Sequence, residues 1–263
     1  TGLKAADSSK IFFVPSLIIQ NVIKEYDKGN YEYVIKICSQ LLENQNYDPQ
    51  IIWETEYRLT LAYARTRNEK FFEHISYFKN EINNLDYYFL LGFYHRHKGN
   101  KNKALEYFES ALLEYPEHSR TKREIVNIYL SQGKYQDALE LARQNYEKRQ
   151  TNIYHIHSYF VCLVRRQISF NDSIIKTLQK LMNAVKDSPD IKADDILRCM
   201  KGEFAFYVEN NFEKANVLLL EAISLNDNKS YPKKSLQEIY RKKGLDSAFE
   251  ELNSNEDFDE EER

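Results

Sequence analysis

Residues that interrupt helices are scarce in this sequence, which has seven glycines and five prolines among 263 residues. Turn-rich β folds need such residues at many tight turns, whereas helices exclude them from their interiors. Hydrophobic residues still make up 42% of the chain, which is enough to form a buried core. The scarcity of glycine and proline therefore predicts an all-α fold.

Cysteine is also scarce, and long apolar runs are absent from the sequence. The three cysteines (Cys38, Cys162, Cys199) are odd in number and far apart, which argues against a disulfide framework or a zinc knuckle and fits a reducing compartment. No apolar run approaches the length of about 18 residues expected of a membrane span, and the first ten residues lack the apolar core of a signal peptide. We therefore expect a cytoplasmic protein without membrane contact. The chain does not begin with Met, so we expect it to be part of a larger polypeptide.

A strong positive charge, which nucleic-acid binders usually carry, is absent. The formal net charge is -3, and residues 253–263 hold six acidic residues and one arginine, so the preceding residues carry a charge near +2. This balance disfavours a nucleic-acid partner. The acidic segment 253–263 has too little apolar surface to bury and is predicted to be a disordered tail.

Motifs of common catalytic and cofactor sites are missing. The sequence has no GxxxxGK[ST] phosphate loop, no GxGxxG after a strand and no GxSxG elbow. The histidine pairs His95/His97 and His155/His157 are two residues apart, so on a helix their rings point in different directions and do not converge on a metal. We expect no metal, no cofactor and no enzymatic activity in this chain.

What is present is a helical pattern from Leu85 to His118. A first helix is predicted to end at Gly99, because glycine adopts backbone angles that other residues avoid. A second helix places Ala104, Phe108 and Ala111 at i, i+4 and i+7, and Pro116 stops it.

This stretch resembles a tetratricopeptide repeat, a helix-turn-helix unit of about 34 residues. The signature positions of that family are occupied by Tyr88, Leu91, Gly92, Gly99, Ala104, Phe108, Ala111 and Pro116. The resemblance implies a right-handed α-solenoid, in which neighbouring repeats share a continuous core.

The pattern recurs along the chain, with Gly133 and Ala138 each 34 residues after Gly99 and Ala104. We predict about six helix-turn-helix repeats plus a terminal helix pair over residues 13–252, after a flexible lead-in at 1–12. The first helix is expected to begin near Val14, with Pro15 in its first turn. A stripe of Phe71, Ile75, Phe78 and Ile82 is expected on one second helix. Asn171–Ser173 is expected to form a turn and a helix N-cap.

In the resembling family, certain positions of each first helix face a concave groove. Carried over, the resemblance implies a groove formed by Phe89, Phe93, Arg96, His97, Arg120, Arg123, Asn127, Tyr154, His157, Arg165 and Phe204. Arg123 and Asn127 match two positions of the family's clamp for a terminal carboxylate, but Tyr154 and Ser158 depart from it. Two alternatives stay open: the arginines bridge neighbouring helices, or the phenylalanines belong to the core because the register differs.

The sequence therefore predicts a non-catalytic scaffold that binds another protein or peptide in its groove, and an acidic segment would suit the arginines. The alternative is a sensor or effector-recognition domain of a larger multidomain regulator or ATPase.

Overall fold

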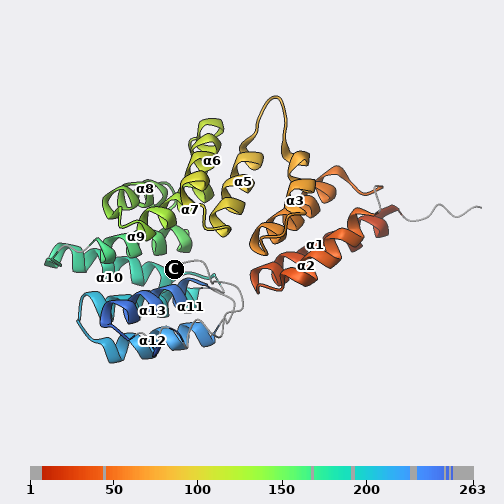
Figure 1. Cartoon of the computed structure of the whole chain (residues 1–263). Coiled ribbons are helices and arrows are strands. Elements are labelled where there is room, and N and C mark those ends of the chain that lie inside the picture. Colours follow the sequence, from red (N-terminus) through yellow and green to blue (C-terminus); the bar gives the residue numbers. More distant parts are fainter. Residues whose placement is uncertain are drawn as a thin grey trace, which may run out of the picture. The chain divides into compact units, whose positions relative to one another are not determined.

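The computed structural model describes residues 8–43, 46–166, 169–190, 193–225, 230–245, 247–248 and 250. In these residues the regular structure consists of thirteen α-helices and one short 3-10 helix, without a strand (Figure 1). The predicted all-α helical-repeat fold is thus confirmed. Residues 1–7 of the predicted lead-in and the acidic tail at 253–263 lie outside the described residues. The chain divides into two compact units, of which unit 1 ends at Glu114 and unit 2 begins at Tyr115.

Unit 1 is built from successive helical hairpins. Its elements are α1 (Ser8–Asp27), α2 (Tyr31–Leu42), α3 (Pro49–Arg65), α4 (Phe71–His74), the 3-10 helix η1 (Ile75–Phe78), α5 (Leu85–His97) and α6 (Lys101–Glu114). Helix α1 packs on α2, α3 on α4, and α5 on α6, while α2 and α5 both pack on α3. Each element therefore contacts its neighbours in the sequence, as expected of a repeat array.

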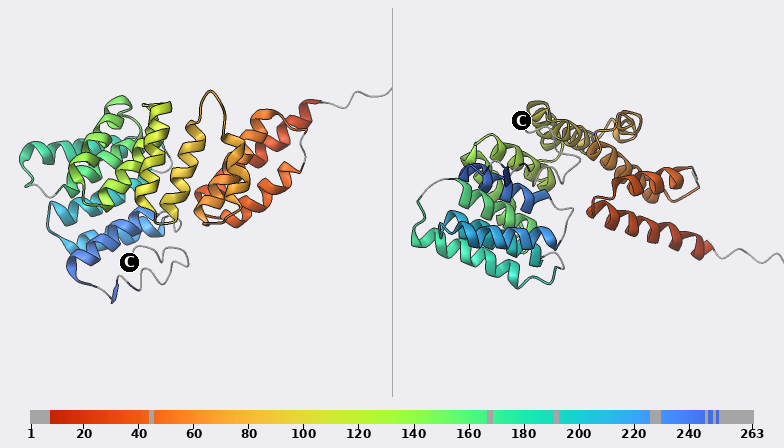
Figure 2. Two further views of the ribbon diagram at one scale, coloured as in Figure 1. Left: turned by 45° about the horizontal axis from the view of Figure 1, so that its top comes forward. Right: turned by 60° about the horizontal axis from the view of Figure 1, so that its bottom comes forward.

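Unit 2 repeats the same arrangement (Figure 2). Its helices are α7 (Ser119–Ser131), α8 (Tyr135–Lys148), α9 (Ile153–Arg165), α10 (Asp172–Lys186), α11 (Ala193–Tyr207), α12 (Phe212–Ser224) and α13 (Ser230–Lys243). The hairpins are α7–α8, α9–α10 and α11–α12, and α13 packs on α11 and α12. Helices α7, α9, α11 and α13 also pack in sequence on one another, which brings their side chains onto one face.

Four second helices of the hairpins bury residues at i, i+4 and i+7, and all of these except Asn145 are apolar or small. These triads are Val34/Cys38/Leu41 in α2, Ala104/Phe108/Ala111 in α6, Ala138/Ala142/Asn145 in α8 and Ala215/Leu219/Ala222 in α12. Ala104 and Ala138, the predicted equivalents, are both fully buried. At Gly92 of α5 an added Cβ would lie 2.6 Å from the Phe108 ring, so glycine is what lets these helices approach.

The turns inside two hairpins are alike. Gly99 and Gly133 have φ angles of 79° and 72°, in the left-handed region that favours glycine. The amide of Asn100 donates to the carbonyl of His95, and that of Lys134 donates to the carbonyl of Tyr129, both at 2.9 Å. This is the Schellman type of helix end, recurring 34 residues later.

Two local predictions are wrong. Helix α1 begins at Ser8 rather than near Val14, so Pro15 lies inside the helix. Proline removes only one backbone donor, and here the helix continues on both sides of it. Ile82 is 92% exposed instead of belonging to the buried stripe. The helix ends earlier because the Asn80 side chain accepts hydrogen bonds from the amides of Ile82 and Asn83, and these bonds compete with helix formation.

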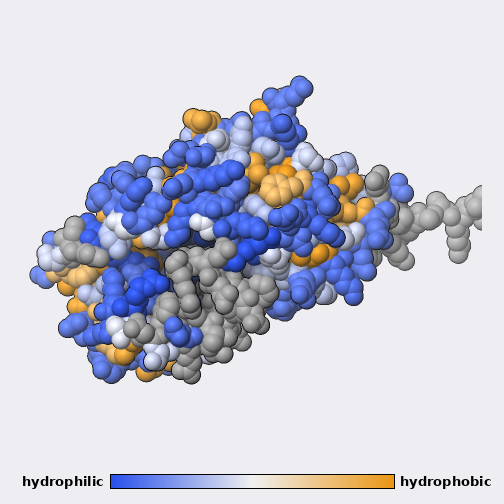
Figure 3. Space-filling model, in the orientation of Figure 1, coloured by the Kyte–Doolittle hydropathy of each residue, from blue (hydrophilic) through white to orange (hydrophobic). Residues whose placement is uncertain are grey.

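The predicted cap of α10 is confirmed, since the Asn171 side chain accepts a hydrogen bond from the Ile174 amide at 3.0 Å. The surface drawn in Figure 3 is mostly hydrophilic, with apolar residues in small separate patches. Among the helices that the structure describes, none combines the length and the apolar character needed to cross a bilayer.

Candidate functional site

The two phenylalanines predicted for the groove, Phe89 and Phe93, are buried in unit 1, so the expectation that they face a partner is wrong. The Phe89 ring lies 5.9 Å from the rings of both Phe93 and Phe108. The guanidinium groups of Arg65 and Arg96 lie 5.0 and 5.7 Å from the Phe93 ring. Cation–π contacts of this kind cover the aromatic faces that would otherwise contact a ligand. The alternative stated above, that Phe89 and Phe93 belong to the core, is therefore the one that holds.

Arg96 and His97, also predicted for the groove, are half-buried beside these rings. The His97 ring lies 4.6 Å from the Phe93 ring, and an Arg96 Nη2 atom lies 3.2 Å from His97 Nε2. The Arg67 guanidinium donates to the His97 carbonyl at 2.7 Å. Arg96 and His97 therefore pack against the Phe93 ring and are also partly exposed to solvent.

In unit 2, α7 and α9 bring several predicted residues together. Arg120, Arg123 and Asn127 are spaced to share one face of α7, and Asn127 is exposed. The Arg123 guanidinium lies 5.5 Å from the ring of Tyr154 on α9, and both side chains are half-buried. The exposed side-chain amide of Asn127 therefore lies one helical turn from Arg123, whose guanidinium contacts the Tyr154 ring.

Half-buried aromatic residues continue this face on α9, α11 and α13. The His157 ring lies 5.1 Å from the ring of Tyr231 on α13. Tyr154, Phe204 and Tyr207 pack at the edge of the main apolar cluster of unit 2. Phe204 therefore keeps a partly exposed position, unlike the phenylalanines of α5.

Arg165 serves a different purpose from the predicted one, because two glutamates of the same chain already hold it. Its side chain is 12% exposed, with Nη2 2.5 Å from Glu203 Oε1 and Nη1 2.6 Å from Glu238 Oε2. Nη2 also donates to Ser235 Oγ at 3.1 Å. The guanidinium therefore links α9 to α11 and α13, and the alternative that an arginine bridges neighbouring helices holds here.

Electrostatics reinforce this buried network. Burial by itself lowers the pKa of Arg165, but the charges of Glu203 and Glu238 together raise it above the ordinary value. Burial raises the pKa of Glu238, while Arg165 and Lys242 lower it below the ordinary value overall. Tyr207 donates to Glu238 at 3.0 Å, and burial raises the pKa of this phenol. Arg165 and Glu238 therefore both stay charged at neutral pH inside unit 2.

Sequence reasoning missed Glu203 and Glu238. Glu203 is fully buried although its residue type is usually exposed. The available signal was a lone acidic residue among apolar neighbours in the segment Cys199–Phe206.

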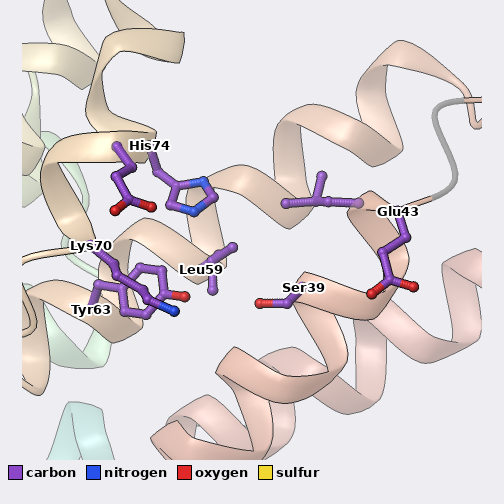
Figure 4. A pocket seen from close by; sticks show the side chains of 8 residues that line it. Ser39, Glu43, Leu59, Tyr63, Lys70 and His74 are labelled. Atoms are coloured by element: carbon purple, nitrogen blue, oxygen red, sulfur yellow. The ribbon is translucent and has the colours of Figure 1, made fainter.

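A second surface feature is a pocket of about 320 Å³ in unit 1, between α2, α3 and α4. Figure 4 shows Ser39 of α2 and Glu43, which caps that helix, across from Tyr63, Lys70 and His74. The His74 ring stacks on Tyr63, and His74 Nδ1 lies 2.7 Å from Glu56 Oε2. The charged groups Glu43, Lys70 and Glu73 around it are exposed, which weakens their hold on a ligand.

Within the described part of the chain, no group of three or more His, Cys, Asp or Glu side chains could hold a metal ion. The three cysteines are free and buried, and burial raises the pKa of the Cys38 and Cys162 thiols to about 12. These thiols therefore stay protonated at neutral pH.

Comparisons with known proteins agree with this architecture. A family model described as tetratricopeptide repeat matches residues 85–118. No curated protein sequence matches the chain. Among solved structures, the Rap conjugation gene regulator of the plasmid pLS20 in complex with the Phr* peptide is similar, with a TM-score of 0.67 and 15% identity. That match covers 92% of this chain and 75% of the regulator.

Two further structures are similar over much of the chain. A thermophilic TPR protein of Thermus thermophilus, TTC0263, is 20% identical with a TM-score of 0.49, covering 65% of this chain and 89% of that one. The human IFIT1 dimer with PPP-AAAA is 16% identical with a TM-score of 0.45, covering 86% of this chain and 65% of that one. The chain thus contains one segment, residues 85–118, that matches the tetratricopeptide-repeat model, and it shares a helical-repeat fold with the Rap regulator.

Proposed function

We propose that this protein is a scaffold that binds an acidic peptide segment on the face of unit 2 formed by α7, α9 and α11. The observation that carries the proposal is the contact between Arg123 and Tyr154 next to the exposed amide of Asn127. We define the peptide face as Arg120, Arg123, Asn127, Tyr154, His157 and Phe204.

The chemistry of this face suits an extended peptide. Asn127 can both donate to and accept from a peptide backbone, because its amide has both kinds of group. Arg123 and Arg120 supply positive charge for an acidic side chain, and Tyr154 and Phe204 offer apolar surface for its neighbours. Arg165 is excluded from the peptide face, because Glu203 and Glu238 neutralise it.

The similarity to the Rap regulator supports a peptide as the class of partner, since that protein is seen with the Phr* peptide. The two proteins share the fold, so the residues proposed to bind the peptide are argued from this chain alone.

A peptide display library selected on the full chain tests the proposal. We expect enriched sequences to carry acidic residues, and fluorescence anisotropy with one labelled consensus peptide then gives an affinity. Arg123→Glu should weaken that affinity by about tenfold or more, and Asn127→Ala by about fivefold. Added salt should weaken the binding of the wild-type chain.

Lys180→Glu, an equal charge change at an exposed position of α10, is the matched control and should leave the affinity unchanged. Selected peptides that lack acidic residues, or an affinity equal in wild type and Arg123→Glu, would contradict the assignment of this face.

A further inference from the structure

A pocket of about 300 Å³ lies between α8 and α9, and it uses a face of α9 that the peptide face does not. From α8 come residues spaced at i, i+3, i+4 and i+7, and from α9 residues at i, i+4 and i+7, so each helix contributes one ridge. The lining residues are Gln136, Leu139, Glu140, Arg143, Tyr159, Leu163 and Arg166.

The pocket joins apolar walls to polar groups. Leu139 and Leu163 are buried at 8% and 6% exposure and form apolar surface in the pocket. The Tyr159 ring is half-buried and stacks on Tyr146 with centroids 5.1 Å apart, which restrains the ring. A ligand here would meet both apolar surface and hydrogen-bonding groups.

The two arginines of the pocket differ in their partners. Arg143 lies 2.7 Å from Glu140 and 4.0 Å from Glu147, so carboxylates already neutralise it. In the residues that the structure describes, no carboxylate forms an ion pair with Arg166, which is half-buried at the end of α9. Among the residues that line the pocket, the carboxylate of Glu140 and the guanidinium groups of Arg143 and Arg166 leave a net charge of about +1, and Arg166 carries the charge that no lining carboxylate pairs with.

The Tyr159 hydroxyl lies within the field of both guanidinium groups. Burial raises the pKa of this phenol, and the charges of Arg143 and Arg166 act in the opposite direction. A ligand anion beside Arg166 would thus find the Tyr159 hydroxyl as a second donor.

We propose that this pocket binds a small monocarboxylate with an apolar body. One negative charge matches the single uncompensated guanidinium, whereas the second charge of a phosphate monoester would have no cation of its own. A guanidinium also fits a planar carboxylate through two parallel hydrogen bonds. The leucines bind the apolar body.

Such a group reaches the pocket either as a free acid or as the terminal carboxylate of a peptide ending in an aliphatic residue. Both sources share the chemistry, and the experiment separates them by comparing 4-methylpentanoate with a short peptide ending in leucine as its free acid and as its amide.

The test is isothermal titration of the full chain with 4-methylpentanoate, its neutral amide and inorganic phosphate. We expect saturable binding of the carboxylate and at least about tenfold weaker binding of the amide and of phosphate. Tighter binding of the leucine peptide acid than of 4-methylpentanoate would assign the ligand to a peptide terminus, and the reverse order to a free acid.

Variants locate the site. Arg166→Met should weaken carboxylate binding by about tenfold, and Tyr159→Phe by about threefold. Arg166→Lys keeps the charge and should retain part of the affinity, which separates lost binding from lost folding. The control Arg149→Met changes an exposed arginine outside the pocket and should leave binding unchanged.

Absence of saturable binding, equal affinity for the amide or phosphate, or indifference to Arg166→Met would overturn the proposal. None of these outcomes bears on the peptide face, because Arg123 and Asn127 do not line this pocket.

Discussion

At the scale of single residues, arginines that look alike in the sequence have different roles in the fold. Arg123 contacts a tyrosine at the surface, whereas Arg165 is held by two glutamates inside unit 2. The sequence places both on first helices but could not reveal that Glu203 and Glu238 converge on one of them. Glu203 and Glu238 are far from Arg165 along the chain, and only tertiary packing decides which side chains meet.

The Arg165 network gives a stability prediction. Arg165→Met should destabilise the chain by about 3 kcal/mol or more in urea unfolding, because Glu203 would be left buried without its cation. Adding Glu203→Gln should recover part of that loss, since the remaining group is neutral.

Arg198→Met is the control for this prediction. Arg198 pairs with Glu221 at an exposed position, so its loss should cost less than about 1 kcal/mol. Equal costs for Arg165→Met and Arg198→Met would show that the buried network does not stabilise unit 2.

His118, which precedes α7, gives a pH prediction. Burial and then the charge of Arg120 lower its pKa from 6.5 to about 4, and its Nδ1 lies 2.6 Å from Thr121 Oγ1. At pH values between these two pKa values, His118 binds a proton in the unfolded chain but not in the folded chain. The free energy of unfolding therefore falls as the pH is lowered through this range. The melting temperature should drop from pH 7 to pH 4, and less steeply in His118→Asn. Parallel pH profiles for the two proteins would refute this assignment.

At the scale of helices, the spacing of small and large residues predicts the hairpins well. The triad Ala104, Phe108 and Ala111 is buried as predicted, because a helix pair can approach only where its contact residues fit. The orientation of α5 was harder to predict. Family positions imply that Phe89 and Phe93 face a groove, but Arg65 of α3 covers Phe93, and this contact depends on how two particular helices pack.

The approach of α5 to α6 can be tested at Gly92. Gly92→Ala should destabilise the chain by about 1–3 kcal/mol in thermal or urea unfolding, since the new methyl group would lie 2.6 Å from the Phe108 ring. Combining it with Phe108→Leu should cost less than the sum of the two single changes, because a smaller side chain makes room for the methyl. Glu109→Ala, at an exposed position of α6, should change stability little. Strict additivity of Gly92→Ala and Phe108→Leu would contradict the close packing of these helices.

At the scale of the whole molecule, the repeat period predicts the number and order of hairpins, because each hairpin buries its apolar side against its neighbours. The peptide face follows less directly. Of the predicted groove residues, those on α7 and α11 and two of the three on α9 remain candidates, while Phe89, Phe93 and Arg165 are used by the fold itself. A single sequence cannot make this distinction, since it requires knowing which surface the packing leaves exposed.

Hydrogen–deuterium exchange of the full chain, with and without a peptide selected from the display library, tests the central claim most directly. Bound peptide should slow exchange in residues 119–131 and 153–165, the first helices that carry Arg123, Asn127 and Tyr154. Exchange in the second helices, 135–148 and 172–186, should change little. Protection confined to those second helices, or to unit 1, would contradict a peptide-binding face on α7, α9 and α11.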